Sequence, residues 1–263
     1  MRIGIIGYGN MGSAFARALL NSPNAESITV YDIDEARKET ALKDGLATAQ
    51  DLYFLIKNSD ILLIAVKPKD VDKLLRDIKD YITADKIVMT IVAGLELSFY
   101  EEILGKGIKL VRLMPNIGVL IGKGSIAFTH NGRLSQEEVE TTLDLFSACG
   151  KLYEIPESLF DSFTALAGSG PAFVMEFIDA MAMGGVKEGF SYEQALQIAI
   201  DTVLSSAYLL REKGGNPNEW ITKVTSPGGT TIEGVAYLER KGFRGTVIRC
   251  IERTSEKAKK LKG

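Results

Sequence analysis

Histidine and cysteine are scarce in this chain, and their scarcity excludes several kinds of site. Among 263 residues there are one histidine, His130, and two cysteines, Cys149 and Cys250. These are too few for a Cys/His metal cluster or a disulfide framework, so we expect no metal and a reducing, cytoplasmic compartment. His130 stands in a polar segment with Asn131 and Gly132, which indicates a turn rather than a Ser-His-Asp triad.

Long apolar runs and an excess of positive charge are also missing. The longest apolar segments, such as 61–66, have the length of a strand, far below the roughly 20 residues of a membrane span. The formal net charge of −3 gives no sign of a nucleic-acid-binding surface. The first residues show no charged-then-apolar targeting pattern. With 46% hydrophobic and 25% charged residues, we expect a soluble globular protein without membrane or nucleic-acid partners.

The first twelve residues carry the most informative pattern. An apolar run at 3–6 predicts a buried strand, Gly7, Gly9 and Gly12 follow in G-x-G-x-x-G spacing, and residues 14–19 are typical of a helix. Gly7 permits a tight turn, Gly9 lets the backbone approach a pyrophosphate, and Gly12 lets the helix lie close to its strand. The unpaired N–H groups at the helix start suit phosphates. A dinucleotide-binding turn is therefore predicted, the alternative being a glycine-rich turn without a ligand.

Strand and helix patterns alternate through residues 1–155. Asp34 is expected to cap one of the helices, and Ser98 another, in a capping box with Glu101. The expected strands are 3–6, 28–31, 61–66, 86–92, 108–113, 123–129 and 151–155. Alternation of this kind predicts an α/β fold, with a parallel, doubly wound, Rossmann-like sheet and right-handed crossovers, as a dinucleotide-binding domain.

The pattern becomes almost entirely helical over residues 156–263. Pro171 is expected to open a long helix to about 188, and Ser191 to cap a second that runs to about 213. Further helices are expected around Trp220, at 231–241 and at 243–261. The first two are apolar on more than one face and rich in small residues, more than one thin domain can cover. We therefore expect an all-helical C-terminal dimerisation domain whose helices interleave in a homodimer.

Asp32 is the first candidate for a contact with the dinucleotide. It ends the second predicted strand, 20 residues after Gly12, where a carboxylate accepts hydrogen bonds from the adenosine ribose and repels a 2′-phosphate. Asp32 could instead cap the next helix, and Asp34 could share either role. The charge of these residues favours NADH over NADPH.

Other candidates come from strand ends and from glycine-rich loops. Segments 65–68 and 93–94 end consecutive strands, so their backbone should line the nicotinamide half of a dinucleotide, although Lys67 could equally be a solvated loop lysine. Loops 167–171 and 225–231 combine hydroxyls with glycines before helices, which suits a small carboxylate, although helix capping alone could explain them. No spacing marks a general acid/base pair. The absence of such a pair suits the reduction of a substrate such as a protonated imine, whose carbon is already electrophilic and needs no strong general acid or base.

Taken together, these segments resemble the pyrroline-5-carboxylate reductase family over essentially the whole chain. The segments that carry the resemblance are 7–12, 65–68, 93–94, 112–116, 167–172 and, most specifically, Val224-Thr-Ser-Pro-Gly-Gly-Thr-Thr-Ile232. The resemblance implies NAD(P)H-dependent reduction of 1-pyrroline-5-carboxylate to L-proline, the last step of proline biosynthesis. It also implies interleaved dimers that join into decamers.

The resemblance, with Asp32, assigns the site residues. The cofactor-binding set is Gly7, Tyr8, Gly9, Asn10, Met11, Gly12, Asp32, Ala65, Val66, Lys67, Pro68, Ala93, Gly94, Pro115 and Asn116. The substrate-binding set is Ser169, Val224, Ser226, Gly228, Gly229, Thr230 and Thr231. Within it, Ser226, Gly228, Gly229 and Thr230 would bind the carboxylate. Thr231 would hydrogen-bond the ring nitrogen and is the catalytic candidate.

Three departures from the usual family pattern bear on these expectations. First, Ile117-Gly118-Val119 replaces Thr-Pro-Ala beside the nicotinamide. Second, Ile33 and Asp34 replace Arg and Ser/Thr after the second predicted strand. Third, Asn216-Pro217 replaces His-Pro after the two long helices. The second departure agrees with NADH. The first leaves open reduction of another cyclic imino acid, and a third possibility is a protein that binds the dinucleotide without turnover.

Overall fold

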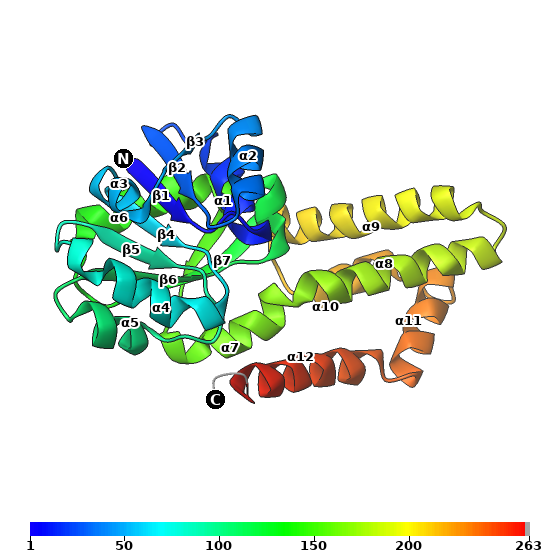
Figure 1. Ribbon diagram of the computed structural model, residues 1–263. Coiled ribbons are helices and arrows are strands. Elements are labelled where there is room, and N and C mark those ends of the chain that lie inside the picture. The colour runs from blue at the N-terminus through cyan, green and yellow to red at the C-terminus, as the bar shows by residue number, and fades with distance from the viewer. Residues whose placement is uncertain (261–263) are drawn as a thin grey trace. The chain divides into compact units, whose positions relative to one another are not determined.

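The computed structural model describes residues 1–260 and divides the chain into two compact units (Figure 1). The first comprises Met1–Gly168 together with the segment that begins at Ser255, and the second comprises Ser169–Thr254. Residues 156–168 thus pack with the sheet, although their sequence pattern is helical. None of the helices in the described chain is both long and apolar enough to cross a membrane.

One eight-stranded sheet forms the centre of the first unit, and its strand order is β3-β2-β1-β4-β5-β6-β7-β8. The strands are β1 (Arg2–Ile6), β2 (Ser27–Tyr31), β3 (Ala47–Thr48), β4 (Ile61–Ile64), β5 (Ile87–Thr90), β6 (Lys109–Met114), β7 (Gly124–His130) and β8 (Gly150–Glu154). The order of the first six strands is that of a dinucleotide-binding Rossmann sheet, which confirms the predicted fold class.

One strand pair departs from the expected parallel sheet. β7 runs antiparallel to β6, with Val111 opposite His130 and Leu113 opposite Phe128. The connection between them holds only a short 3-10 turn, η2 (Ile117–Ile121), and a parallel pairing requires a longer crossover. The expectation of a fully parallel sheet was therefore wrong at this pair. His130, expected in a turn, is the last residue of β7, and its Nδ1 accepts the Gly132 N–H at 3.1 Å.

Helices cover both faces of the sheet, as a doubly wound fold requires (Figure 1). On one face, Phe15 of α1 and Phe146 of α6 pack at 5.9 Å between ring centroids, over Ile5 and Leu63 of the sheet. On the other face, α3, α4 and α5 cover strand residues such as Leu62. The helices of this unit are α1 (Asn10–Leu19), α2 (Glu35–Lys43), α3 (Leu52–Lys57), α4 (Pro68–Ile78), α5 (Leu97–Leu104), α6 (Gln136–Phe146) and α7 (Phe160–Phe163).

The predicted helix caps are partly confirmed. Asp34 caps α2 by accepting the Ala36 N–H at 3.0 Å. The capping box of Ser98 and Glu101 was wrong, because the N-cap residue of α5 is Glu96, two residues before Ser98, and the helix begins at Leu97. The Leu97 N–H instead donates to Oε1 of the distant Glu157 at 2.9 Å. A carboxylate brought in by tertiary structure therefore satisfies the helix start that the local sequence appeared to cap.

The second unit contains helices with little core of their own. They are α8 (Gly170–Lys187), α9 (Tyr192–Lys213), α10 (Pro217–Val224), α11 (Thr230–Arg240) and α12 (Phe243–Lys259), the last of which continues past the division between units. The predicted cap of α9 at Ser191 is confirmed, and α8 begins at Gly170, one residue before the predicted Pro171. The predicted last residue of the final helix, Leu261, lies outside the described residues.

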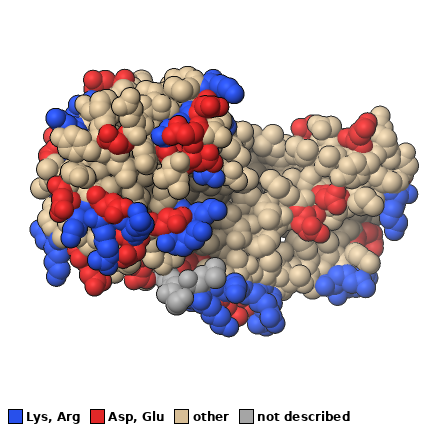
Figure 2. Space-filling view, in the orientation of Figure 1, with Lys and Arg blue, Asp and Glu red and all other residues tan. Residues whose placement is uncertain are grey.

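The pair α8 and α9 packs through small residues and leaves large ones exposed. Ala182 of α8 lies with Ala195 and Ala199 of α9 in a small buried cluster. Met175 is 60% exposed and Ile198 51% exposed. In the view of Figure 2, uncharged side chains make up most of the surface over these two helices. Such faces need cover, which agrees with the expected association of this unit with another copy.

Candidate active site

Four segments of the first unit, each following one of four neighbouring strands, meet at the carboxyl end of the sheet. Beyond the strand ends, the Gly7 N–H donates to the Tyr31 carbonyl at 2.8 Å, and the Ala65 N–H donates to the Ile6 carbonyl at 2.8 Å. The Ile91 N–H donates to the Ile64 carbonyl at 3.2 Å. The segments that follow β2, β1, β4 and β5 therefore lie side by side, and the strand order reverses between β1 and β4. Open α/β sheets bind their ligands at this switch point.

The three glycines of the first turn differ in whether the fold itself requires glycine at their positions. Gly7 has φ +101°, and a Cβ there would lie 2.7 Å from the Ala65 carbonyl oxygen. A Cβ at Gly12 would collide with the carbonyl oxygen of Gly7. At Gly9 a Cβ would meet only Nη1 of Arg37, at 3.6 Å. The fold therefore requires glycine at positions 7 and 12, whereas at position 9 it leaves space that a ligand can use.

The start of α1 is suited to an anion. Gly9 is the N-cap residue, it makes no side-chain capping bond, and no acidic residue lies in the first turn. The first amides of the helix are thus not capped by a side chain, and no carboxylate of the first turn competes for the positive end of the helix dipole. A phosphate group next to Gly9 would meet these amides.

Tyr8 holds this turn from inside the fold. Its N–H donates to Oδ2 of Asp32 at 2.6 Å, and its hydroxyl donates to Oδ2 of Asp44 at 2.5 Å. Nη2 of Arg17 donates to the same carboxylate at 2.8 Å. Burial, together with the hydrogen bond to Asp44, raises the pKa of Tyr8 to about 12. The phenol therefore anchors the turn to α1 and to the end of α2 and stays neutral at physiological pH.

Asp32 directly follows β2, as predicted, but its carboxylate already has hydrogen-bond partners. The side chain is 4% exposed, and besides the Tyr8 N–H it accepts the Asp34 N–H at 3.0 Å. Nη1 of Arg37 lies 3.5 Å from its Oδ2, and Nε of Arg37 lies 3.7 Å from Asp34. Arg37, whose side chain is 46% exposed, thus brings a positive charge beside Gly9 that sequence reasoning missed. Its position three residues after the capping aspartate was the available signal.

The remaining cofactor candidates also lie at strand ends. Lys67 is exposed at the start of α4, where it makes no side-chain capping bond. Before Ala93 and Gly94, the Thr90 hydroxyl is hydrogen-bonded to the buried Tyr100 hydroxyl at 2.7 Å and accepts the Val92 N–H at 3.2 Å. These bonds fix the end of β5, and the 93–94 turn follows directly from a rigid support.

The next strand, β6, ends in a buried ion pair and a hydrogen-bonded asparagine. Arg112, with a side chain 3% exposed, donates from Nη1 to Oε1 of Glu157 at 2.8 Å, and its guanidinium lies 4.6 Å from the centre of the Phe160 ring. Pro115 is buried, and the Asn116 side chain bonds to backbone groups of three segments. Sequence reasoning had assigned this segment to the cofactor without foreseeing these contacts.

The predicted substrate loop belongs to the second unit. The Gly229 N–H donates to the Ser226 carbonyl at 3.0 Å and closes a four-residue turn, with Pro227 at its second position and Gly228, at φ +65°, at its third. These residue types are those of a type II turn. The helix α11 then begins at Thr230 with no side-chain capping bond at its start.

The capping explanation for the two hydroxyl-rich loops is not supported by their hydrogen bonds. Ser169 is the N-cap residue of α8 and makes no side-chain capping bond. At α11 the N-cap residue is Gly229, which has no side chain to cap with. The hydroxyls of Ser169 and Thr231 thus do not cap these helices, and the first amides of α11 are not capped by a side chain.

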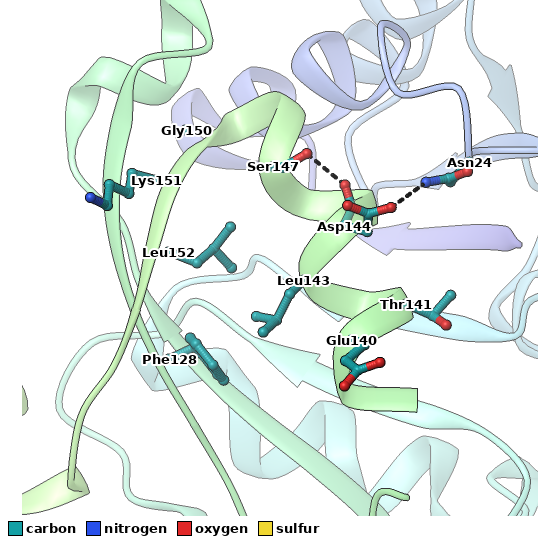
Figure 3. A pocket seen from close by; sticks show the side chains of 10 residues that line it. All are labelled: Asn24, Phe128, Glu140, Thr141, Leu143, Asp144, Ser147, Gly150, Lys151 and Leu152. Atoms are coloured by element: carbon teal, nitrogen blue, oxygen red, sulfur yellow. Dashed lines mark hydrogen bonds between the residues drawn. The ribbon is translucent and has the colours of Figure 1, made fainter. Parts of the chain in front are cut away.

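A surface hollow of about 760 Å³ lies elsewhere on the first unit (Figure 3). Phe128, Leu143 and Leu152 line its apolar part, while Asn24 Nδ2 donates to the Asp144 carboxylate at 3.2 Å. None of the residues assigned to cofactor or substrate lines it. The hollow is open, and no buried charged side chain is directed into it, so we do not assign the chemistry to this place.

Comparisons with known proteins find relatives along the whole chain. A family model described as pyrroline-5-carboxylate reductase dimerisation matches residues 157–261, and one described as NADP oxidoreductase, coenzyme F420-dependent, matches residues 2–94. The chain is 56% identical to the pyrroline-5-carboxylate reductase of Aquifex aeolicus, over 99% of this chain and 97% of that protein. It is 39% identical to the enzyme of that name from Methanosarcina acetivorans, over 99% and 97%.

Solved structures agree. The 1-pyrroline-5-carboxylate reductase of Streptococcus pyogenes is similar with a TM-score of 0.88 and 36% identity, over 99% of this chain and 98% of that one. The Plasmodium falciparum pyrroline carboxylate reductase, solved with NADP bound, is similar with a TM-score of 0.87 and 30% identity, over 100% and 98%.

Proposed function

Because the chain belongs to the pyrroline-5-carboxylate reductase family, we propose that it reduces 1-pyrroline-5-carboxylate to L-proline with NAD(P)H, the last step of proline biosynthesis. The resemblance found in the motifs is thereby confirmed. The observation that carries the proposal is the turn at the β1–β4 switch point. There Gly9 leaves space that the fold does not need, in front of helix amides that no side chain caps.

The first unit would hold the dinucleotide at the carboxyl end of its sheet. The pyrophosphate would lie on the amides of residues 9–12, and the ribose near Asp32. The backbone after β4, β5 and β6, including Pro115 and Asn116, would line the nicotinamide. A reduced nicotinamide supplies the hydride that converts the imine carbon to an amine carbon. Water exclusion and alignment remain for the protein to provide.

The second unit would hold the substrate. The turn at 226–229 and the first amides of α11 would bind the carboxylate, because helix starts favour anions. Ser169 and Val224 would line the ring. The hydroxyl of Thr231 would hydrogen-bond the ring nitrogen and hold the proton on it, which keeps the imine carbon electrophilic during hydride transfer.

Turnover itself tests the proposal. Loss of absorbance of the reduced cofactor is followed with 1-pyrroline-5-carboxylate and compared with a six-membered cyclic imino acid. The second substrate is of interest because Ile117, 51% exposed, directly follows Asn116 in place of the usual threonine. A higher kcat/KM for the six-membered ring would select that activity, and absence of turnover with both would indicate a non-catalytic binder.

Thr231→Ala is expected to lower kcat/KM by roughly 1–3 kcal/mol, or about 5- to 150-fold, through loss of a hydrogen bond to a charged group. Steady-state kinetics with the imine measure this. Thr141→Ala is the matched control, since that exposed hydroxyl bonds only to the Glu137 carbonyl of its own helix, at 2.7 Å. Unchanged kinetics of Thr231→Ala would refute the role of this residue.

For the cofactor we propose NADH, since Asp32, Ile33 and Asp34 offer acidic groups and no hydroxyl to a 2′-phosphate. Arg37 provides the internal check. Arg37→Ala is expected to lower kcat/KM with NADPH by about tenfold, ~1.4 kcal/mol, and with NADH by much less, because only NADPH offers this cation a phosphate. Arg76→Ala, at an exposed i,i+4 pair with Asp72, is the control. A large preference of the unchanged protein for NADPH would contradict the NADH proposal.

The dimerisation family match supports a homo-oligomer, and we propose a dimer with interleaved helices of the second unit, assembled further into decamers, in the cytoplasm. The exposed Met175 and Ile198 support burial against another copy. Light scattering at micromolar concentration tests the assembly, and a monomer would contradict it.

A further inference from the structure

We infer that the Asn116 side chain is a positioning residue, which ties the end of β6 to the helical turn that leads into Ser169. The inference rests on the proposed function in that Ser169 is taken to touch the substrate. The hydrogen bonds from which it is drawn all lie within the first unit.

The Asn116 amide makes three hydrogen bonds to backbone groups. Its Oδ1 accepts the N–H of Gly118 and the N–H of Ser125, both at 3.1 Å, and its Nδ2 donates to the Ala167 carbonyl at 3.0 Å. The two N–H donors determine which end of the amide is oxygen. Both lone pairs of Oδ1 are used, so a contact of this oxygen with the dinucleotide would require breaking the existing bonds. Through these three bonds Asn116 acts on the segments that it joins.

The turn that Asn116 reaches has an unusual geometry. Residues Thr164–Gly168 form a π-helical turn, between α7 and Ser169. Turns of this kind are rare in proteins, and those that occur are often found at functional sites. A wider turn shifts the carbonyls away from the partners of a regular helix, and the Ala167 carbonyl has Asn116 as a donor from another element. Met114 flanks the same turn, because a Cβ at Gly168 would lie 3.3 Å from its Cε.

The bond between Asn116 and the Ala167 carbonyl lies close in sequence to Ser169, a residue of the proposed substrate site. Ser169 follows Ala167 by two residues, and it begins α8 with no side-chain capping bond. A rotation of the π-turn is therefore passed directly to the Ser169 hydroxyl. Small misplacements of positioning groups are costly in catalysis, about a hundredfold for 1 Å.

Asn116→Asp separates this role from a cofactor contact. The aspartate keeps an oxygen for the N–H groups of Gly118 and Ser125, but a second oxygen now faces the Ala167 carbonyl. We expect kcat/KM for the imine to fall about tenfold or more, chiefly through KM. The Kd of NADH should change less than threefold, because the nicotinamide is assigned to the backbone of Asn116 and not to its side chain. The ratio of variant to unchanged activity should rise as the pH falls, because a protonated aspartate regains a donor.

Hydrogen–deuterium exchange gives a readout independent of turnover. Amides in residues 160–172 of Asn116→Asp should exchange faster than in the unchanged protein. Asn131→Asp is the control at the opposite end of β6, since its Oδ1 accepts the Leu110 N–H and its Nδ2 donates to the Ile108 carbonyl and to the Glu101 carboxylate. It should leave exchange at 160–172 and the KM unchanged.

The inference is overturned if exchange in 160–172 is unaffected by Asn116→Asp, whatever the activity. It is also overturned if the Kd of NADH rises as steeply as KM, which would make Asn116 a cofactor ligand. Failure of the unchanged protein to turn over the imine would instead refute the proposed function, and exchange would still decide the role of Asn116.

Discussion

Gly9→Ala is expected to weaken NADH binding at least tenfold while the fold remains stable, and Gly12→Ala is expected to destabilise the fold itself. At position 9 the backbone is extended, at φ −78° and ψ −168°, and the added methyl meets only the end of the flexible Arg37 side chain, at 3.6 Å. Its free energy of unfolding should therefore change by less than about 1 kcal/mol. The methyl would, however, occupy the space in which a pyrophosphate must approach the backbone.

At position 12 the methyl meets backbone instead. Besides the Gly7 carbonyl oxygen, it would lie 3.1 Å from the Gly7 carbonyl carbon and 3.2 Å from Cβ of Ala65. Overpacking of this kind costs about 1–3 kcal/mol, with the upper end expected here because backbone atoms cannot rotate away.

Two measurements on each variant separate the effects of Gly9→Ala and Gly12→Ala. Denaturant unfolding without cofactor gives the stability, at one protein concentration because the chain associates. Fluorescence titration with NADH gives the Kd. If Gly9→Ala bound NADH as tightly as the unchanged protein, the pyrophosphate would not lie at this turn.

Glu157→Ala is expected to lower the free energy of unfolding by about 3 kcal/mol. The substitution leaves the Arg112 guanidinium, 3% exposed, without its carboxylate, and it also removes the acceptor of the Leu97 N–H at the start of α5. Removing one partner of a buried pair costs about 3–5 kcal/mol, and the lower end applies because the Glu157 side chain is 26% exposed. Denaturant unfolding measures the change.

An exposed pair of the same length is the control. Lys73 Nζ and Asp77 Oδ2 are also 2.8 Å apart, but their side chains are 85% and 51% exposed. Asp77→Ala should change the free energy of unfolding by less than about 1 kcal/mol, because water screens the charges and Lys73 is solvated without its partner. Equal losses at the two sites would show that burial does not determine the contribution of the Arg112 pair.

Local patterns predicted most elements because the burial of each element leaves a pattern in its own residues. The strands β1, β4 and β5 are buried along almost their whole length, so each appears as an apolar run that only a covered parallel strand tolerates. The cap at Asp34 is also local, since donor and acceptor lie two residues apart. The glycine turn was recognisable for the same reason.

Predictions failed, or missed residues, where the deciding partner is distant in sequence. The start of α5 is satisfied by Glu157, 60 residues away, and not by Ser98. The Asn116 amide reaches Ala167, 51 residues away. No periodicity carries information on such pairs, because each depends on how two elements meet. The direction of β7 was missed for a different, local reason, since the connection between the predicted strands 108–113 and 123–129 is too short for a parallel crossover.

The order of the elements, the dinucleotide turn and the membership of the family were all present in the amino-acid sequence. Each depends on contacts within a few residues, or on a motif whose spacing is itself the signal. Only the tertiary structure showed that Gly9 alone of the three glycines leaves room for a ligand, that Arg37 lies beside Asp32, and that Asn116 holds the turn before Ser169. The Asn116 contact joins segments far apart in the chain, whereas Arg37 reaches Asp32 across the short connection between β2 and α2. In both cases the folded geometry, and not the residue type, decides which groups touch.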